Sequence, residues 1–258
     1  MATIDKHGHI TGPLGGLRFY SLNGKNIVAT KGGPTANQIK KSENYAYTRA
    51  HNAEFGIVSK LASVIFQSHQ MIRPFRHHQA YQILRGNLFR LFPYDETNQH
   101  GQRSLLFSKA IHHFDQMQLS AIPYAEYVTL PVEWNRNNPE EVNFQIKASS
   151  IRSMFRFPKN YHQVNWTLYV QGIKDIEFNQ TINGYTLPLS ECVLPLTPVS
   201  SFQFANHETG KELFCSAPLE KDYNYLIFAV ASYTPFPKPN LSGLHMAACI
   251  GLVSNLSQ

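Results

Sequence analysis

Three kinds of hydrophobic pattern follow one another along the 258 residues of this chain. Short, partly apolar runs come first, a stretch with helical periodicity follows, and from about residue 122 the apolar side chains recur at every second position. We therefore predict an α+β protein with an N-terminal β-hairpin arm, about three α-helices and a C-terminal antiparallel β-sandwich of the Ig-like or jelly-roll-like type. The predicted ranges are 1–34 for the arm, 35–120 for the helical region and 121–258 for the sandwich.

The N-terminal hairpin is the strongest local signal. Asn23-Gly24 lies between two short runs, 17–22 and 26–30, and this dipeptide tolerates the positive φ angles that a two-residue hairpin turn requires. Glycine pairs at 15–16 and 32–33 flank the hairpin and leave its ends free of side chains. Because a two-stranded hairpin is marginally stable in water, it needs a partner surface on its own chain or on a neighbouring copy.

Both partners remain open at this point. On a neighbouring copy, the hairpin would add to an exposed sheet edge through backbone hydrogen bonds. On its own chain, it would pack against the helices. The candidate assembly interface consists of the apolar, turn and flanking positions of the hairpin, namely Leu17, Phe19, Tyr20, Asn23, Gly24, Ile27, Gly32 and Gly33.

Helical periodicity predicts three helices after the hairpin. Thr35 is a suitable N-cap for the first, whose apolar stripe extends over 55–72. Pro74 ends or kinks this helix. A second helix is predicted over 77–92, and a third over 102–118.

The C-terminal half alternates with a period of two, which is typical of half-buried strands. The clearest strands are 142–148 and 164–171. Further candidates are 124–132, 200–204, 213–216, 223–233 and 244–253. Seven or so strands with turn residues between them, and no helical segment, predict an antiparallel sandwich.

Composition adds a reason to expect contacts between chains. Charged residues make up 16% of the chain, against roughly 25% in an average soluble protein, while aromatic residues reach 12%. Protein interfaces are poor in Lys, Glu and Asp and rich in aromatic residues, so this balance favours burial between copies. An ordinary β-rich protein is the alternative, because strands also select aromatic residues.

The two halves of the chain differ in charge. Residues 1–120 contain 14 Lys and Arg against 6 Asp and Glu, whereas residues 121–258 contain 9 against 11. Opposite signs favour a head-to-tail contact between copies. Binding of nucleic acid is disfavoured, because the basic residues are scattered singly along the chain.

A string of motifs spans residues 12–60. It contains Gly-x-x-Gly-Gly-x-x-Phe-Tyr at 12–20, Asn-Gly-Lys at 23–25, Lys-Gly-Gly-Pro at 31–34 and Asn-Ala-Glu-Phe-Gly at 52–56. This string resembles the N-terminus of an uncharacterised group of proteins from Bacteroidota. The resemblance implies helices and then a β-rich half after this opening, in a phage-like or particle-forming context. It implies no activity, catalytic residue or cofactor.

Residues that could carry chemistry lack a recognisable setting. The adjacent pairs His77-His78 and His112-His113 would point about 100° apart on a helix, so neither pair can chelate one metal ion. Cys192, Cys215 and Cys249 are widely spaced, which favours buried thiols over disulfides. No P-loop, GxSxG or GxGxxG motif occurs. We predict neither an enzyme nor a cofactor.

Two classes of function fit these patterns. The first is a structural protein that polymerises into a tube, filament, sheath or shell. The second is a carbohydrate- or ligand-binding module, in which aromatic residues such as Trp134, Tyr161, Trp166 and Tyr185 stack on sugar rings. Trp166 falls in the core phase of its strand, which favours burial. The N-terminus lacks the apolar core of a secretory signal, so we expect a cytoplasmic protein with no membrane contact, either resident or released as a particle.

Overall fold

A computed structural model describes residues 2–254, apart from residues 7, 31, 111, 116, 148–149, 186–187, 211 and 237–241. Contacts divide the chain into two compact units, Met1–Arg49 and Ala50–Gln258. Two residues of the predicted patterns, Lys31 and Ala148, lie outside the described residues.

The first unit contains a four-stranded antiparallel sheet, which we call the N-terminal sheet. Its strands, in spatial order, are β1 (Thr3–Ile4), β2 (Ile10–Leu14), β3 (Leu17–Leu22) and β4 (Lys25–Thr30). Asn23 and Gly24 have φ angles of 51° and 74°, so the predicted turn and the β3–β4 hairpin are confirmed. The hairpin is not alone, because β1 and β2 precede it and a turn at Gly15 joins β2 to β3.

Helix α1 (Ala36–Lys41) begins where the sequence predicted. The Thr35 hydroxyl accepts a hydrogen bond from the Gln38 backbone N–H (3.2 Å), and the Gln38 side chain accepts one from the Thr35 backbone N–H (2.7 Å). This reciprocal capping box satisfies N–H groups that have no partner within a helix. The backbone becomes extended at Ser42, and a 3₁₀ turn follows at Glu43–Tyr45.

Two longer helices follow. Helix α2 (Ala46–Ser68) leads into a 3₁₀ segment (Gln70–Phe75) that contains Pro74, and α3 (Ala80–Phe89) comes next. The single helix predicted from Thr35 to Pro74 is wrong in its first part, because the break at Ser42 separates α1 from α2, which begins at Ala46. Helix α3 agrees with the predicted range 77–92 to within three residues at each end. The predicted apolar stripe of α2 is confirmed, because its central members are fully buried: Val58, Leu61, Ala62 and Ile65.

The predicted third helix, 102–118, is wrong. Its described residues include a 3₁₀ turn at Phe107–Lys109 and the short strand β5 (Met117–Gln118). The Asp175 carboxylate accepts hydrogen bonds from both the backbone N–H (2.9 Å) and the hydroxyl of Ser108. Such tertiary partners occupy a donor that a helix would use internally, and they override the helical spacing of the apolar residues.

The predicted strand 124–132 is wrong: Val128 makes only an isolated bridge with Phe155, and a strand begins only at Val132. Tyr124–Tyr127 forms a single helical turn, α4, in which the buried Tyr124 hydroxyl accepts a hydrogen bond from the Trp166 indole (2.7 Å). The Tyr124 backbone N–H donates to the Gln118 side chain (3.0 Å). A buried indole N–H needs a partner, and the helical turn places the phenol there.

The other strand predictions are confirmed, and the strands form two larger antiparallel sheets. In spatial order the five-stranded sheet consists of β11 (Thr197–Ala205), β8 (Tyr161–Ile173), β13 (Asn224–Pro235), β14 (Leu244–Val253) and β5. The three-stranded sheet consists of β12 (Glu212–Pro218), β7 (Glu141–Lys147) and β6 (Val132–Asn138). Smaller elements include β9 (Phe178–Asn179), β10 (Gly184–Tyr185), α5 (Ile151–Met154) and 3₁₀ turns at Phe92–Tyr94 and Leu189–Glu191.

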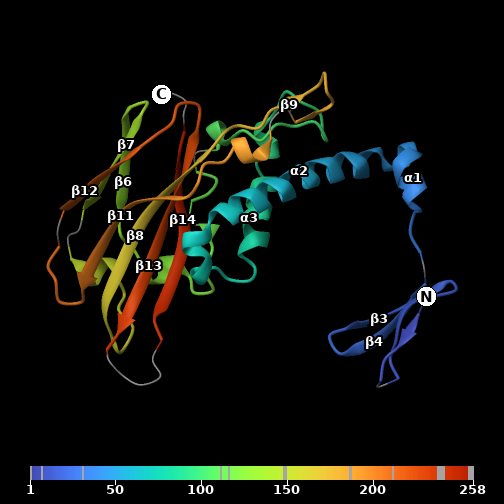
Figure 1. Ribbon diagram of the computed structural model, residues 1–258, viewed down its shortest axis with the longest axis horizontal. Helices are drawn as coiled ribbons and strands as arrows, with labels where there is room; N and C mark the ends of the chain where they lie inside the picture. Colours follow the sequence, from blue (N-terminus) through green and yellow to red (C-terminus); the bar gives the residue numbers. More distant parts are fainter. Residues whose placement is uncertain are drawn as a thin grey trace. The chain divides into compact units, whose positions relative to one another are not determined.

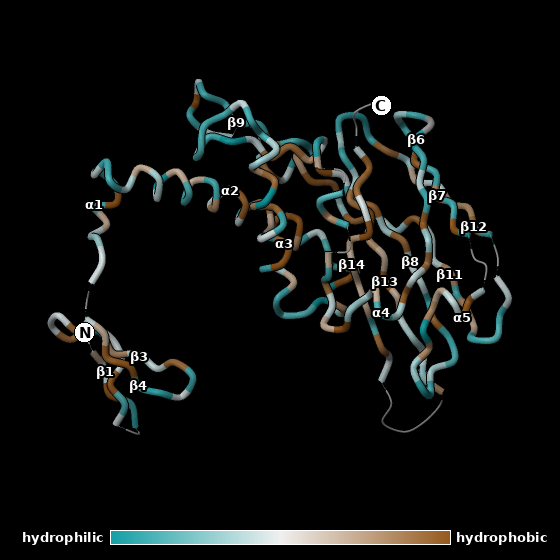
Figure 2. The backbone as a smooth tube through the Cα atoms, turned by 180° about the vertical axis from the view of Figure 1, so that it is seen from behind, coloured by the Kyte–Doolittle hydropathy of each residue, from teal (hydrophilic) through white to brown (hydrophobic). Residues whose placement is uncertain are grey.

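Three layers make up the second unit, and the five-stranded sheet is the middle layer (Figure 1). One buried cluster joins this sheet to the helices through residues such as Leu61, Leu84 and Phe228. A second cluster joins its other face to the three-stranded sheet through residues such as Phe144 and Trp166. Because β13 is covered on both faces, it is almost continuously apolar, and the hydrophobic colour follows it in Figure 2.

The protein is thus rich in antiparallel β-structure and contains few helices. Its two larger sheets face each other across one shared core. None of the helices in the described part of the chain combines the length and the hydropathy needed to cross a membrane.

A buried histidine lies between the helices and the middle sheet. The side-chain amide of Gln171 donates to Ser68 and to the Leu194 carbonyl, so its Oε1 accepts a hydrogen bond from His69 Nε2 (2.7 Å). The other ring nitrogen of His69, Nδ1, is buried and has no hydrogen-bond partner among the described residues. Burial lowers the pKa of His69 from 6.5 to about 4, against the opposing effect of the bond to Gln171.

Stability is expected to fall as the pH drops from 6.5 to 4. In this window the unfolded chain protonates His69 whereas the folded chain does not, so the free energy of unfolding decreases by up to about 3 kcal/mol. The lowered pKa values of Glu54 and Asp95 add to this loss below about pH 5, because the unfolded chain protonates these carboxyl groups before the folded chain does. Denaturant titrations from pH 4 to 7 should show a flatter profile for His69→Gln. Equal slopes for the variant and the wild type would contradict this account.

Candidate functional site

The eight predicted interface residues all lie in or beside the N-terminal sheet, but the structure does not bring them to one surface. Successive side chains of a strand point to opposite faces. Leu17 and Phe19 therefore share one face of β3, while Tyr20 lies on the other, opposite Ile27 of β4. The other four are turn or flanking residues: Asn23 and Gly24 in the β3–β4 turn, and Gly32 and Gly33 after β4.

One face of the sheet carries apolar side chains and no charge along β2, β3 and β4. Leu14 pairs directly with Leu17, and Phe19 pairs directly with Val28. Directly opposed residues of antiparallel strands lie on the same face, so these four form a continuous patch, which we call the apolar face. The exposed fractions of Leu14, Leu17 and Val28 are 56%, 40% and 55%.

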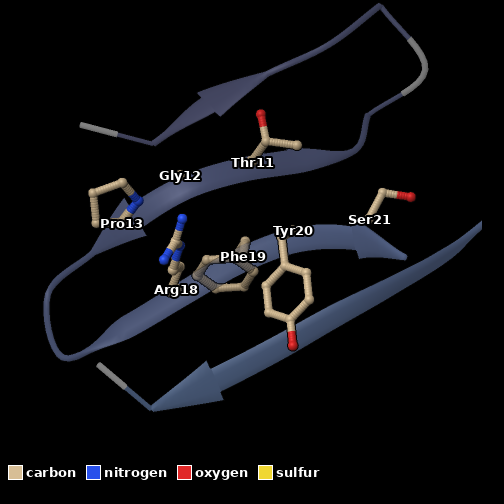
Figure 3. A pocket seen from close by; sticks show the side chains of 7 residues that line it. All are labelled: Thr11, Gly12, Pro13, Arg18, Phe19, Tyr20 and Ser21. Atoms are coloured by element: carbon tan, nitrogen blue, oxygen red, sulfur yellow. The ribbon is translucent and has the colours of Figure 1, made fainter. Parts of the chain in front are cut away.

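The opposite face, which we call the basic face, mixes apolar and positively charged side chains. Its members are Arg18, Tyr20, Leu22, Lys25 and Ile27. Tyr20 pairs with Ile27, and Leu22 pairs with Lys25. An open hollow of about 500 Å³ lies beside β2 and β3, where Pro13, Arg18 and Tyr20 are among its lining residues (Figure 3).

None of the described residues in 2–49 is buried. An apolar cross-strand pair, Ile4 opposite Ile10, adds to the unburied surface, and Ile4 is 71% exposed. Sequence reasoning missed Leu14, Val28 and this pair. The Gly15-Gly16 pair is itself a hairpin turn, which places Leu14 directly opposite Leu17. Recognising this turn in the sequence would have identified Leu14.

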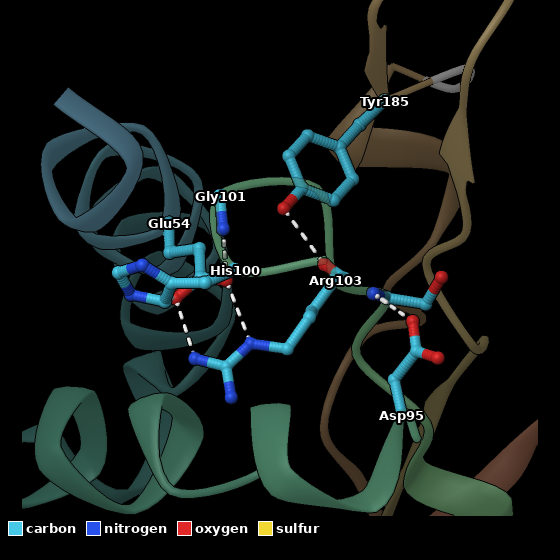
Figure 4. A network of polar contacts seen from close by, with 7 residues as sticks. Glu54, Asp95, His100, Gly101, Arg103 and Tyr185 are labelled. Carbon is cyan, nitrogen blue, oxygen red and sulfur yellow. Dashed lines mark hydrogen bonds and ion pairs between the residues drawn. The ribbon is translucent and has the colours of Figure 1, made fainter. Parts of the chain in front are cut away.

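The second unit contains a network of polar contacts around the carboxylate of Glu54 (Figure 4). Glu54 on α2 is fully buried, and Arg103 binds both of its carboxylate oxygens at 2.8 Å. The Gly101 backbone N–H donates to one oxygen (2.8 Å), and His100 Nε2 lies 3.4 Å from the other. The Tyr185 hydroxyl donates to the Arg103 carbonyl (2.9 Å).

Both buried carboxylates of this region are held in the charged form. Burial raises the pKa of Glu54, but the hydrogen bonds from Arg103 and Gly101 outweigh it, and the net pKa is lowered. Asp95 behaves in the same way, because its oxygens accept hydrogen bonds from Asn98, Ser104 and Thr97.

The network therefore holds the segment 95–104 against α2 through hydrogen bonds and an ion pair, and it is not arranged as a reactive centre. The oxygens of Glu54 and Asp95 are occupied by donors of the same chain, and a general base or nucleophile needs a lone pair that substrate can reach. Glu54 belongs to the Asn-Ala-Glu-Phe-Gly motif of the sequence, so the structure gives that motif a stabilising role.

The aromatic residues considered for sugar stacking are not exposed. Trp166 is fully buried, as its strand phase predicted. Trp134, Tyr161 and Tyr185 are partly buried, and the Trp134 ring lies directly against the backbone of Gly251. A stacking platform requires an open ring face, which these positions do not offer as a group.

The sequence placed His77 and His78 about 100° apart on a helix, but they precede α3 and their ring centroids lie 3.9 Å apart. His112 is exposed and pairs with Asp115 (3.1 Å), and the part of the chain that the structure describes holds no group of three His, Cys, Asp or Glu suited to a metal ion. The three cysteines are free thiols: Cys192 and Cys249 are buried and Cys215 is partly buried. Burial raises the pKa of all three, so none is an activated nucleophile.

Comparison of the chain with protein-family models, curated proteins and solved structures gives no match. The resemblance of residues 12–60 to the Bacteroidota group stays a prediction.

Gly101→Ala is expected to destabilise the second unit by about 2 kcal/mol or more. Gly101 has a φ of 94°, which alanine adopts poorly, and a Cβ there would lie 2.6 Å from the Ala50 Cβ. The matched control is Gly86→Ala in α3, where a Cβ meets no atom within 4 Å and helix propensity favours alanine. Denaturant unfolding of both variants measures the difference in the free energy of unfolding. Equal stability of the two variants would contradict the stabilising role of this network.

Proposed function

We propose that this protein is a non-enzymatic structural protein, which assembles with copies of itself into a tube, filament, sheath or shell through its N-terminal sheet. The observation that carries the proposal is the unburied apolar face. Leu14, Leu17, Phe19 and Val28 form one patch, and none of them is buried. Contiguous exposed apolar patches mark interaction surfaces.

The size of the hydrophobic gain supports association. Burying one Leu, Val or Phe side chain contributes about 1.5–3 kcal/mol. Four such side chains lie on the apolar face, and a second copy presents the same four. Because the apolar face carries no charge, two copies can bring these surfaces together without burying like charges.

The edge of the sheet offers a second mode of attachment. Strand β4 is the last strand of the N-terminal sheet, so its outer backbone groups lie outside the ladder. Its sequence, from Lys25 to Thr30, contains no proline that would block pairing. Such an edge can accept a strand from a neighbouring chain.

The second unit supplies the body of the assembly in this proposal. Its two facing sheets are best described as a sandwich of the Ig-like or jelly-roll-like type, which gives a rigid block with two buried clusters. The low charge content of the chain, 16%, suits large contacts between such blocks.

Deletion of residues 1–33 is expected to leave a folded body that no longer multimerises. The deletion removes the N-terminal sheet but keeps the Thr35 cap and both buried clusters. Light scattering after size-exclusion chromatography measures the mass, and circular dichroism checks the fold. If the truncated chain keeps the mass of the full-length assembly, the N-terminal sheet is not the connecting element.

Replacing two apolar-face residues should weaken association without unfolding the body. In Leu14→Thr/Val28→Thr the new side chains retain good strand propensity but remove apolar surface. Phe214→Thr is the matched control, because Phe214 is 67% exposed on the three-stranded sheet, outside the N-terminal sheet. We define the half-assembly concentration as the protein concentration at which half of the chains are assembled. Sedimentation velocity should show that it is at least about tenfold higher for the double variant than for the wild type, and unchanged for Phe214→Thr. Identical behaviour of all three proteins would refute a role for the apolar face.

A further inference from the structure

The body contains a groove at the seam between its two sheets. Strand β11 of the five-stranded sheet and β12 of the three-stranded sheet lie next to each other but belong to different ladders. A groove of about 400 Å³ opens there, with Val170, Leu194, Val199, Leu219 and Tyr225 among its apolar lining. This volume lies within the range of ligand and side-chain pockets.

Prolines on both edges explain why the seam stays open. Pro198 on β11 lies at a break in register, and Pro218 ends β12. Proline has no backbone N–H, so these two edges cannot be joined by a regular ladder at this point. The groove is therefore not closed by a ladder between the two edges, and its floor contains the nearly buried residues Val170, Leu219 and Tyr225.

One acidic residue, Glu220, is among the residues that line this groove. The segment 136–141, which contains the β6–β7 turn, meets the segment 218–222 there, because the Leu219 backbone N–H donates to the Glu140 carbonyl (2.7 Å). Glu220 lines the groove itself, and its backbone N–H donates to the Tyr225 hydroxyl (2.5 Å). The carboxylates of these two segments are Glu140, Glu141, Glu220 and Asp222, against the cations Arg136 and Lys221. The local net charge is −2.

The basic face of the N-terminal sheet has the complementary chemistry. Arg18 and Lys25 are the charged residues within β1 to β4, and they accompany Tyr20, Leu22 and Ile27. An apolar centre with positive charges at its margin matches an apolar groove with a negative margin. The apolar face carries no charge in β2 to β4, so it offers nothing to the acidic margin.

We infer that the basic face of one copy docks in the acidic-edged groove of a neighbouring copy, with Arg18 facing Glu220. This inference rests on the proposed function, and it names the surface that receives the N-terminal sheet. The two surfaces are different, so each copy gives one contact and receives another. Such a head-to-tail contact builds a ring or a filament rather than a closed pair.

Charge reversal on the full-length chain tests this contact. Arg18→Glu and Glu220→Arg should each raise the half-assembly concentration at low salt by at least about tenfold, because each places like charges together. Lys25→Glu is a second variant on the basic face and should act like Arg18→Glu. Glu126→Arg on α4 is the control, since Glu126 is exposed and does not line the groove.

The decisive step is to mix the two single variants. Arg18→Glu copies and Glu220→Arg copies should assemble together in alternation, with a half-assembly concentration within about threefold of wild type, because both kinds of contact then join opposite charges. Docking within one chain cannot produce this recovery. Reversal variants that assemble like wild type, or a mixture that stays dispersed, would overturn the groove but leave assembly intact. A wild-type chain that is monomeric at all concentrations would overturn the proposed function as well.

Discussion

A small sheet is stable in water only if it buries an apolar face, and the N-terminal sheet does not do so within its own unit. Its apolar face, formed by Leu14, Leu17, Phe19 and Val28, is unburied, and so are all other described residues up to Arg49. A sheet of this size gains independent stability from a hydrophobic face that is covered or from packing against a helix. We therefore propose that a surface outside this sheet stabilises it, and the proposed structural role rests on that dependence.

The second unit satisfies the same requirement internally. Its middle sheet is covered on one face by α2 and α3 and on the other by the three-stranded sheet, so that β13 is buried almost throughout. The buried carboxylate of Glu54 is matched by Arg103 and by the Gly101 N–H, which fixes a long loop against α2. The second unit thus buries its apolar surfaces and uses these polar groups for structure, whereas the apolar face of the N-terminal sheet is not buried.

Local signals were sufficient for much of the fold. The Asn23-Gly24 turn, the Thr35 cap and the alternation of the long strands each depend on neighbouring residues, and each was predicted correctly. The segment 102–118 was mispredicted because its partners, such as Asp175, are distant in sequence. At the interface, the predicted set mixed both faces of β3, although alternation alone separates Phe19 from Tyr20. The preceding strands were missed because β1 has only two residues and β2 contains Gly12 and Pro13.

Hydrogen exchange of the backbone amides in β2 and β3, measured by mass spectrometry over a hundredfold range of protein concentration, tests the central claim most directly. If a second copy stabilises the N-terminal sheet, protection of these amides rises with concentration, while protection of β13 stays constant. Strong protection of β3 that does not change with concentration would show that the sheet is stabilised within its own chain, and would contradict the account.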